Sequence, residues 1–279
     1  MAPLIRTRNL HLTYPDGTKA LDGIDIELFE GEIIGLIGQN GSGKSTLSKC
    51  LNATLEPSKG TVEIDGTATT DEQNSGDIVE KVGYVFQNPD HQLFNRTVWD
   101  EIAYGPRNLD MEEEKVEERV REAAEVAGVH EQRFEEHPNL LTKGLRQRVA
   151  IASILSMKPD TIIVDEPTTG QDARQSLEIM NFLQQLQSEE DRTIIIVTHI
   201  IPIVQQYCDR VICLRNGKKL LEDEPKVVFN QPEELAKSAV QPSQIARLSH
   251  SLSGEFPDVE TPYLTPDEAI EDFGSKYGR

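Results

Sequence analysis

Two stretches of this sequence combine residues that could bind a phosphate group and act on it. The first, GQNGSGKST at Gly38–Thr46, fits the template G-x-x-x-x-G-K-[ST], whose glycines let backbone N–H groups surround a phosphate. In such a loop Lys44 neutralises phosphate oxygens and the Ser45 hydroxyl ligates Mg²⁺. The second, TIIVDEP, is an apolar run that ends in the adjacent carboxylates Asp165 and Glu166. The residues expected to bind phosphate are Gly38, Gln39, Asn40, Gly41, Ser42, Gly43, Lys44, Ser45 and Thr46.

Short apolar runs rich in β-branched residues must position these groups. They alternate with helical stretches, which indicates an α/β fold with a mostly parallel sheet. A strand before the phosphate loop and a helix after it are the context that a phosphate site requires. Asp165 is expected at the carboxyl edge of the sheet, where α/β proteins bind ligands. The expected buried strands are Ile33–Ile37, Val82–Phe86, Thr161–Val164 and Thr193–Val197.

The formal net charge of −20 limits the partners that this chain can have. Binding to nucleic acid needs clustered Lys and Arg, and anionic lipid also attracts basic segments, so neither surface is expected to bind the chain directly. Any association with a membrane is expected to depend on a protein partner. A source that accumulates salt is the preferred interpretation of this charge, because salt screens the repulsion. An ordinary acidic bias is the alternative.

The rest of the composition is typical of a cytosolic globular protein. The 279 residues can form one large domain or two small ones, and no apolar run approaches the length of a membrane-spanning helix. The start, MAPLIRTRNLHLTY, lacks the apolar region of a secretory signal. Cys50, Cys208 and Cys213 lack metal-ligand spacing and are expected to be free, buried thiols.

Two further regions are expected to be helical. In Met111–Ala127, apolar residues recur at helical spacing among many Glu, which predicts a surface helix within a helical subdomain at about 88–157. After about residue 230, Pro-punctuated short helices are expected. In LTPDEAIEDFG, Thr265 is the expected N-cap, Glu268 closes a capping box, and Gly274 is expected to end the helix. The expected domains are 1–235 and a C-terminal helical extension at 236–279.

The segment LTKGLRQRVAIASIL, which begins at Leu141, resembles the LSGGQ-x-QR-x-x-x-A signature of ATP-binding cassette (ABC) proteins. It lies about twenty residues before Glu166, a spacing that is specific to ABC ATPases. The resemblance implies an ABC ATPase nucleotide-binding domain: a P-loop core with a mostly parallel sheet, an antiparallel β subdomain, a helical signature subdomain and a short C-terminal extension. It also implies that ATP and Mg²⁺ are bound.

The resemblance implies roles for residues of one subunit. Asp165 would hold Mg²⁺ through water, and Glu166 would be the general base that activates the attacking water. His199, after TIIIVT, matches the switch histidine that contacts the γ-phosphate, and Gln87 matches the Q-loop glutamine near Mg²⁺. Tyr14 matches the aromatic residue that stacks on adenine. Structural alternatives remain open. Glu166 could cap a turn, His199 could have a purely structural role, and Tyr14 could be an aromatic residue that packs beside a turn without binding adenine.

ABC ATPases bind ATP between one subunit's phosphate loop and the other subunit's signature. Here Thr142 keeps the signature hydroxyl and Gly144 keeps the amide, whereas Lys143 replaces a glycine and Leu145 replaces a glutamine. The expected outcome is an altered but working signature, with an inactive one, or unequal sites in a two-subunit arrangement, as alternatives. Asp172 matches the D-loop aspartate, which lies at the dimer interface.

The stretch GYVFQNPDHQLFNRTVWDEIAYGPRNL resembles the ATPase subunits of energy-coupling-factor (ECF) importers, which take up cobalt, nickel and vitamins. This resemblance implies a peripheral location on the cytoplasmic face of the membrane, with an integral transmembrane subunit and a substrate-capturing membrane subunit as partners. It also implies a homodimer, or a heterodimer with a second ABC ATPase. The residues expected to line the groove for the transmembrane subunit are Asp90, His91, Gln92 and Phe94. The alternatives are a soluble non-transport ABC ATPase and a weakly hydrolysing regulatory subunit.

Overall fold

The computed structural model describes residues 2–70, 78, 80–256, 258–259 and 261–277. Its centre is a six-stranded sheet with the order β10-β9-β3-β8-β7-β6, in which only β10 runs antiparallel to its neighbour. The strands are β3 (Ile33–Gly38), β6 (Val82–Val85), β7 (Thr161–Asp165), β8 (Thr193–Val197), β9 (Arg210–Arg215) and β10 (Lys218–Asp223). The expected α/β class and the four expected strands are confirmed, with ends that differ by at most one residue.

A second, four-stranded antiparallel sheet has the order β2-β1-β4-β5. Its strands are β1 (Ile5–Thr13), β2 (Lys19–Leu28), β4 (Lys59–Ile64) and β5 (Thr67–Ala68). Helix α1 (Lys44–Leu51) shares one apolar core with both sheets, as the buried residues Leu10, Leu36 and Leu47 illustrate. The helix that follows the phosphate loop is therefore held from two sides.

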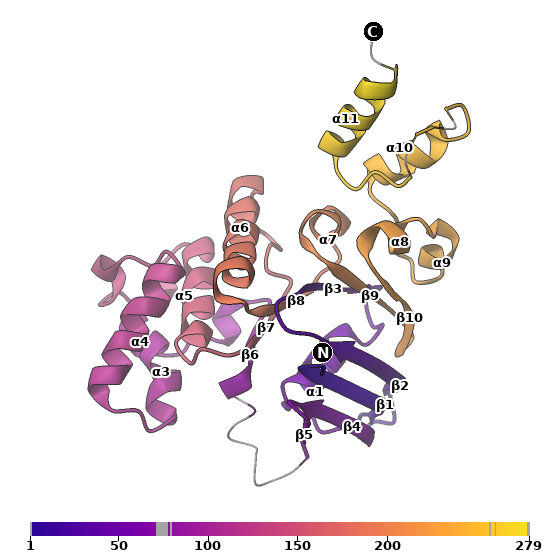
Figure 1. Cartoon of the computed structure of the whole chain (residues 1–279). Helices are drawn as coiled ribbons and strands as arrows, with labels where there is room; N and C mark the ends of the chain where they lie inside the picture. Colours follow the sequence, from indigo (N-terminus) through magenta and orange to yellow (C-terminus); the bar gives the residue numbers. More distant parts are fainter. Residues whose placement is uncertain (1, 71–77, 79, 257, 260, 278–279) are drawn as a thin grey trace.

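A helical arm covers one end of the central sheet (Figure 1). It consists of α3 (Val98–Asn108), α4 (Glu113–Val126), α5 (Lys143–Leu155) and the short turns η2 (Pro89–His91), η3 (Glu131–Arg133) and η4 (Pro138–Leu140). The helix expected at Met111–Ala127 is confirmed as α4, which buries Val116 and Val120 against α3 and α5. Among the described residues, no helix has the length and apolar character needed to cross a membrane.

The remaining helices are α6 (Ala173–Glu190), α7 (Ile201–Tyr207), α8 (Pro225–Phe229), α9 (Pro232–Lys237), α10 (Gln244–Leu252) and α11 (Pro266–Tyr277). Figure 1 shows α10 and α11 beyond α7 and α8, away from the helical arm. The expected capping box is confirmed, because Glu268 N donates to Thr265 Oγ1 at 3.2 Å and Thr265 N donates to Glu268 Oε2 at 3.4 Å.

The expectation that Gly274 ends this helix is wrong, since α11 continues to Tyr277. Phe256 contacts both Phe273 and Tyr277, with ring centroids 5.4 and 5.0 Å apart, so aromatic packing holds the last turn. A glycine inside a helix costs only about 1 kcal/mol, which such contacts can offset. The three cysteines are free and buried, as expected.

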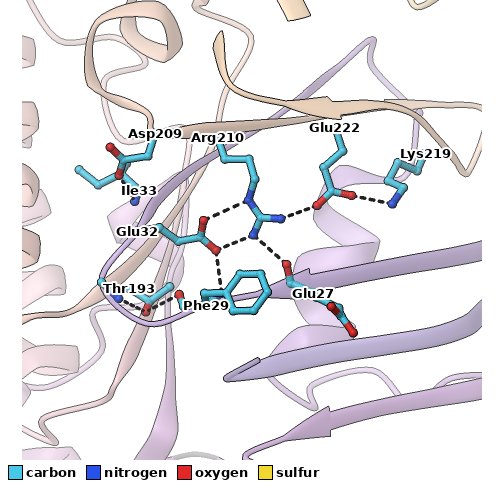
Figure 2. A network of polar contacts seen from close by, with 10 residues as sticks. Glu27, Phe29, Glu32, Ile33, Thr193, Asp209, Arg210, Lys219 and Glu222 are labelled. Carbon is cyan, nitrogen blue, oxygen red and sulfur yellow. Dashed lines mark hydrogen bonds and ion pairs between the residues drawn. The ribbon is translucent and has the colours of Figure 1, made fainter. Parts of the chain in front are cut away.

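Arg210, at the start of β9, joins the two sheets (Figure 2). Its guanidinium donates to Glu32 at 3.0 and 2.5 Å, to Glu222 at 2.5 Å and to the carbonyl of Glu27 in β2 at 2.7 Å. The side chains of Arg210, Glu32 and Glu222 are less than a fifth exposed, so removal of the arginine would leave two carboxylates poorly solvated. Charge-assisted bonds of this kind stabilise a structure more than exposed ion pairs do.

Replacement of this arginine is expected to destabilise the fold. Arg210→Ala should lower the free energy of unfolding by about 2–4 kcal/mol, because Glu32 loses its cation and Glu222 keeps only the contact with Lys219. Arg174→Ala is the control, because Arg174 is 89% exposed and its pair with Glu178 should contribute less than about 1 kcal/mol. Urea unfolding followed by circular dichroism measures both, and equal losses would contradict the role given to Arg210.

Candidate active site

The parallel strands bring residues from distant parts of the chain to one edge. Leu36 and Asp165 both pair with Val197, and Glu166 N extends the ladder by donating to the Val197 carbonyl at 2.8 Å. A cavity of about 820 Å³ opens at this edge. Its lining residues are Gly38, Gln39, Asn40, Gly41, Gly43, Lys44, Ser45, Thr46, Gln87, Asp165, Glu166, His199, Ile201, Ala239, Val240 and Gln241.

The phosphate loop has the glycines that its path requires. A Cβ on Gly38 would collide with the Leu214 carbonyl of β9, and one on Gly43 would lie 2.7 Å from the Ala20 carbonyl. Both glycines also have positive φ, of +146° and +106°. Ser42, which was expected among the phosphate-binding residues, is fully buried and is absent from the cavity lining.

Lys44 bends back over the loop that precedes it. Its Nζ donates to the carbonyls of Gly38 at 2.8 Å and Gln39 at 3.1 Å. Burial lowers the pKa of Lys44, and the charges of Glu166 and Asp165 oppose that effect. A cation that donates its hydrogen bonds to neutral carbonyls in a glycine-lined cavity fits an incoming anion such as a phosphate.

Asp165 is 9% exposed, and its surroundings act on its charge in opposite directions. Burial is the main cause that raises the pKa of this carboxyl, and the charge of Glu166 adds to it. Hydrogen bonds from Tyr84 and Ser45, together with the charge of Lys44, lower the pKa in part. The Tyr84 hydroxyl donates to Asp165 Oδ2 at 2.8 Å. Asp165 is therefore a buried carboxylate whose charge depends on nearby donors and cations.

Glu166 has three side-chain partners around its carboxylate. His199 Nδ1 lies 2.7 Å from Oε1, and the hydroxyls of Thr198 and Thr169 donate to Oε2 at 3.2 and 3.1 Å. Glu166 also has a positive φ of +49°, which a non-glycine residue adopts at a cost. The turn that follows is closed by the Glu166 backbone carbonyl, which accepts from Thr169 N at 3.2 Å. The backbone of Glu166 therefore closes the turn, and its side chain lines the cavity.

The structure places the other expected residues in different surroundings. Gln87 is exposed and lines the cavity from the end of β6. Tyr14 lies outside the lining: its ring packs on the core of the antiparallel sheet, and its hydroxyl lies 3.1 Å from Thr46 Oγ1.

Thr142, Lys143, Gly144 and Asp172 do not line the cavity of their own chain. Thr142 caps α5 by accepting from Leu145 N at 3.4 Å, and Asp172 caps α6 by accepting from Gln175 N at 2.8 Å. Lys143 is the first residue of α5 and has no positive φ, so the helix accepts a side chain where the ABC signature has a glycine. Leu145 is half-buried and packs against the main core.

Several residues of the site could not be recognised from the sequence. Tyr84 was expected only as part of a buried strand, and the hydroxyl partners of Glu166, Thr169 and Thr198, carry no motif of their own. The segment Ala239–Gln241 lines the cavity although it lies far along the chain. It is anchored by Ser238, whose hydroxyl lies 3.2 Å from Cys213 Sγ in β9. A β-branched or polar residue in a strand or turn carries no signal for such contacts.

The comparisons with known proteins agree with this geometry. A family model described as ABC transporter matches residues 21–169. The chain belongs to the ABC transporter family. Among its relatives, the energy-coupling factor transporter ATP-binding protein EcfA1 of Caldanaerobacter subterraneus subsp. tengcongensis is 38% identical, over 97% of this chain and 99% of the relative.

A putative ABC transporter ATP-binding protein of the same organism, TTE1589, is 45% identical over 92% of this chain, which spans 45% of that relative's length. Among solved structures, cbiO1 from Clostridium perfringens, described as part of the ABC transporter complex cbiONQ, has a TM-score of 0.76 and 35% identity. The match covers 91% of this chain and all of that one. A dimer of the ATP-binding cassette MJ0796 bound to ADP and Pi has a TM-score of 0.71 and 29% identity, covering 79% and 98% of the two chains.

Loss of the Tyr84 hydroxyl is expected to change the pH dependence of the site. Tyr84→Phe removes a hydrogen bond to the charged form of Asp165, so the pKa of Asp165 should rise further. The carboxylate would then be protonated at a higher pH, and the acidic limb of ATP hydrolysis should move to higher pH. Profiles of kcat/KM against pH measure this. Tyr207→Phe, which removes a hydroxyl that bonds to Asn181, is the control; identical profiles for all three proteins would contradict the role of Tyr84.

Proposed function

We propose that this chain is the ATP-hydrolysing motor subunit of an ECF-type membrane importer, which couples ATP binding and hydrolysis to uptake of a transition-metal ion or a vitamin. The observation that carries the proposal is the Glu166 carboxylate, held by His199 and two hydroxyls in the same cavity as the phosphate loop. A regulatory subunit that hydrolyses poorly would have no need for this arrangement. The names of the relatives support the importer branch.

The donors at the cavity fit Mg²⁺ bound with ATP. Ser45 supplies a hydroxyl, Gln87 an amide oxygen and Asp165 a carboxylate that acts through water, and oxygen donors are those that Mg²⁺ prefers. Among the described residues, no group of three or more His, Cys, Asp or Glu could hold a metal ion, so this mixed set is the candidate. Once bound, Mg²⁺ neutralises charge on the phosphates.

In this mechanism the chain's own groups bind ATP and activate water. Tyr14 is half-buried and lies beside the loop, where its accessible side would stack on adenine. The N-terminus of α1 and Lys44 hold the phosphates, and His199 orients the attacking water. Glu166 accepts the proton of that water, a contribution typically of about 10²–10⁴ in rate. The carboxylate can do so because its partners hold it toward the cavity.

A second subunit would complete each site. Thr142, Lys143 and Gly144 lie outside their own chain's cavity, which fits a signature that acts on the partner's ATP, with Asp172 near the interface. The dimers of the similar cassette MJ0796 support this arrangement. Both a homodimer and a heterodimer with a second ABC ATPase are compatible with it. We assign residues 1–235 to the nucleotide-binding domain, its helical subdomain to 88–157, and 236–279 to the extension.

An exposed surface on the helical arm fits the integral transmembrane subunit. Phe94 is 65% exposed and packs edge-on against Tyr104, which is 46% exposed. Asp90 is paired with Arg146 at 2.8 Å, and the Gln92 amide donates to the Ala150 carbonyl at 2.8 Å, so both hold the shape of this surface. Binding here would place the chain peripherally on the cytoplasmic face, with the substrate-capturing subunit in the membrane. Nucleic acid is not a partner in this proposal.

Removal of the general base should separate binding from turnover. Glu166→Gln should still bind ATP and accumulate as a closed dimer, while kcat falls by at least about 10²-fold. Phosphate release and size-exclusion chromatography with ATP measure the two effects. Glu117→Gln, on the exposed side of α4, is the control and should leave both unchanged. Near-normal turnover in Glu166→Gln would remove the basis of the proposed mechanism.

The importer assignment is tested by what co-purifies with the chain from detergent-solubilised membranes of its source. An integral membrane protein with a small substrate-capturing subunit is expected. Phe94→Asp should reduce this recovery at least about tenfold and leave ATP hydrolysis unchanged, because a charge would be placed in an apolar contact. Val227→Asp, at an exposed position of α8, is the control. Recovery of the wild-type chain alone or with ribosomes would favour a non-transport ATPase.

A further inference from the structure

The side chain of Lys143 joins the start of α5 to the loop that follows Glu166. Its Nζ donates to the carbonyl of Thr169 at 3.0 Å. The ammonium also passes close to Gly170, where an added Cβ would lie only 2.5 Å from Nζ. Gly170 has a φ of +74°, a backbone conformation that favours glycine at this position. The Lys143 ammonium therefore lies beside both Thr169 and Gly170 of this loop.

Thr169 is itself fixed to Glu166 by two hydrogen bonds. Its hydroxyl donates to Glu166 Oε2 at 3.1 Å, and its backbone N–H donates to the Glu166 carbonyl at 3.2 Å. The Thr169 carbonyl accepts the hydrogen bond from Lys143 Nζ. One residue thus connects the Lys143 ammonium with the carboxylate that faces the cavity.

This connection exists because the chain departs from the signature that it resembles. The corresponding position of LSGGQ is a glycine, which has no side chain to reach Thr169. The neighbouring Gly144 lies close to the same region, since a Cβ there would be 3.5–3.6 Å from Gln175 and Gln171. The lysine therefore adds a charge-assisted bond at a place where α5 already approaches the loop and α6.

We propose that Lys143 is a positioning residue for Glu166, acting through Thr169 of the same chain. The proposal rests on the proposed function, in which Glu166 is the base for ATP hydrolysis. In the dimer, the start of α5 contacts the partner's ATP through Thr142 and Gly144. Lys143 joins that contact surface to the carboxylate of its own chain.

The test compares Lys143→Met, which keeps the length but loses the donor, with Lys143→Arg, which keeps a donor. Lys143→Met should lower kcat about threefold to tenfold with an unchanged KM for ATP, because the loss affects the base rather than ATP binding. Lys143→Arg should restore kcat to within about twofold. In the nucleotide-free chain, backbone amides of residues 169–171 should exchange hydrogen faster in Lys143→Met than in Lys143→Arg. Lys115→Met, on the exposed side of α4, is the control.

Two results would overturn the proposal. A raised KM or a weaker ATP-dependent dimer with unchanged kcat would show that Lys143 binds the partner's phosphate instead. Wild-type kcat and wild-type amide exchange in Lys143→Met would show that the contact positions nothing. Absence of hydrolysis by the unchanged chain would count against the proposed function, whereas the exchange measurement would still decide whether Lys143 holds the loop.

Discussion

The site depends on the parallel alignment of β3, β8 and β7. Parallel strands end at the same edge, and the register pairs Leu36 and Asp165 with Val197. The phosphate loop, Glu166 and His199 follow these strands directly, so one ladder of backbone hydrogen bonds sets the distances between them. The buried β-branched residues of the strands leave little freedom for a change of register. Without that alignment, the individual motifs would not form a site.

At this edge of the sheet, opposite charges offset part of the effect that burial has on the ionisable groups. Burial lowers the pKa of Lys44 and raises that of Asp165, and each charge partly offsets the effect on the other. The Tyr84 hydroxyl adds a donor from the neighbouring strand. An anion would compete with the carbonyls that now hold Lys44, so ATP binding exchanges neutral acceptors for charged ones. The edge is thus arranged for a charged substrate rather than for maximal stability.

Much of the fold could be predicted because its signals are local. The strands are continuous apolar runs between turn formers, and the capping box at Thr265 and Glu268 depends on residues close together in the chain. The prediction for Gly274 was wrong because aromatic contacts from Phe256 override a weak local preference. The candidate site divides in the same way: the phosphate loop and Glu166 could be found from motifs, whereas Tyr84 could not, since its bond to Asp165 crosses between strands.

By itself the sequence determined the fold class, the phosphate loop, the acidic strand end and the family. Each of these can be recognised from residues that are close together in the chain. Only the tertiary structure decided that Ala239–Gln241 line the cavity, that Arg210 joins the sheets, and that Lys143 reaches Thr169. These contacts join segments far apart along the chain, and their geometry depends on how sheets and helices pack. Packing is a property of the whole core, so no local pattern could reveal them.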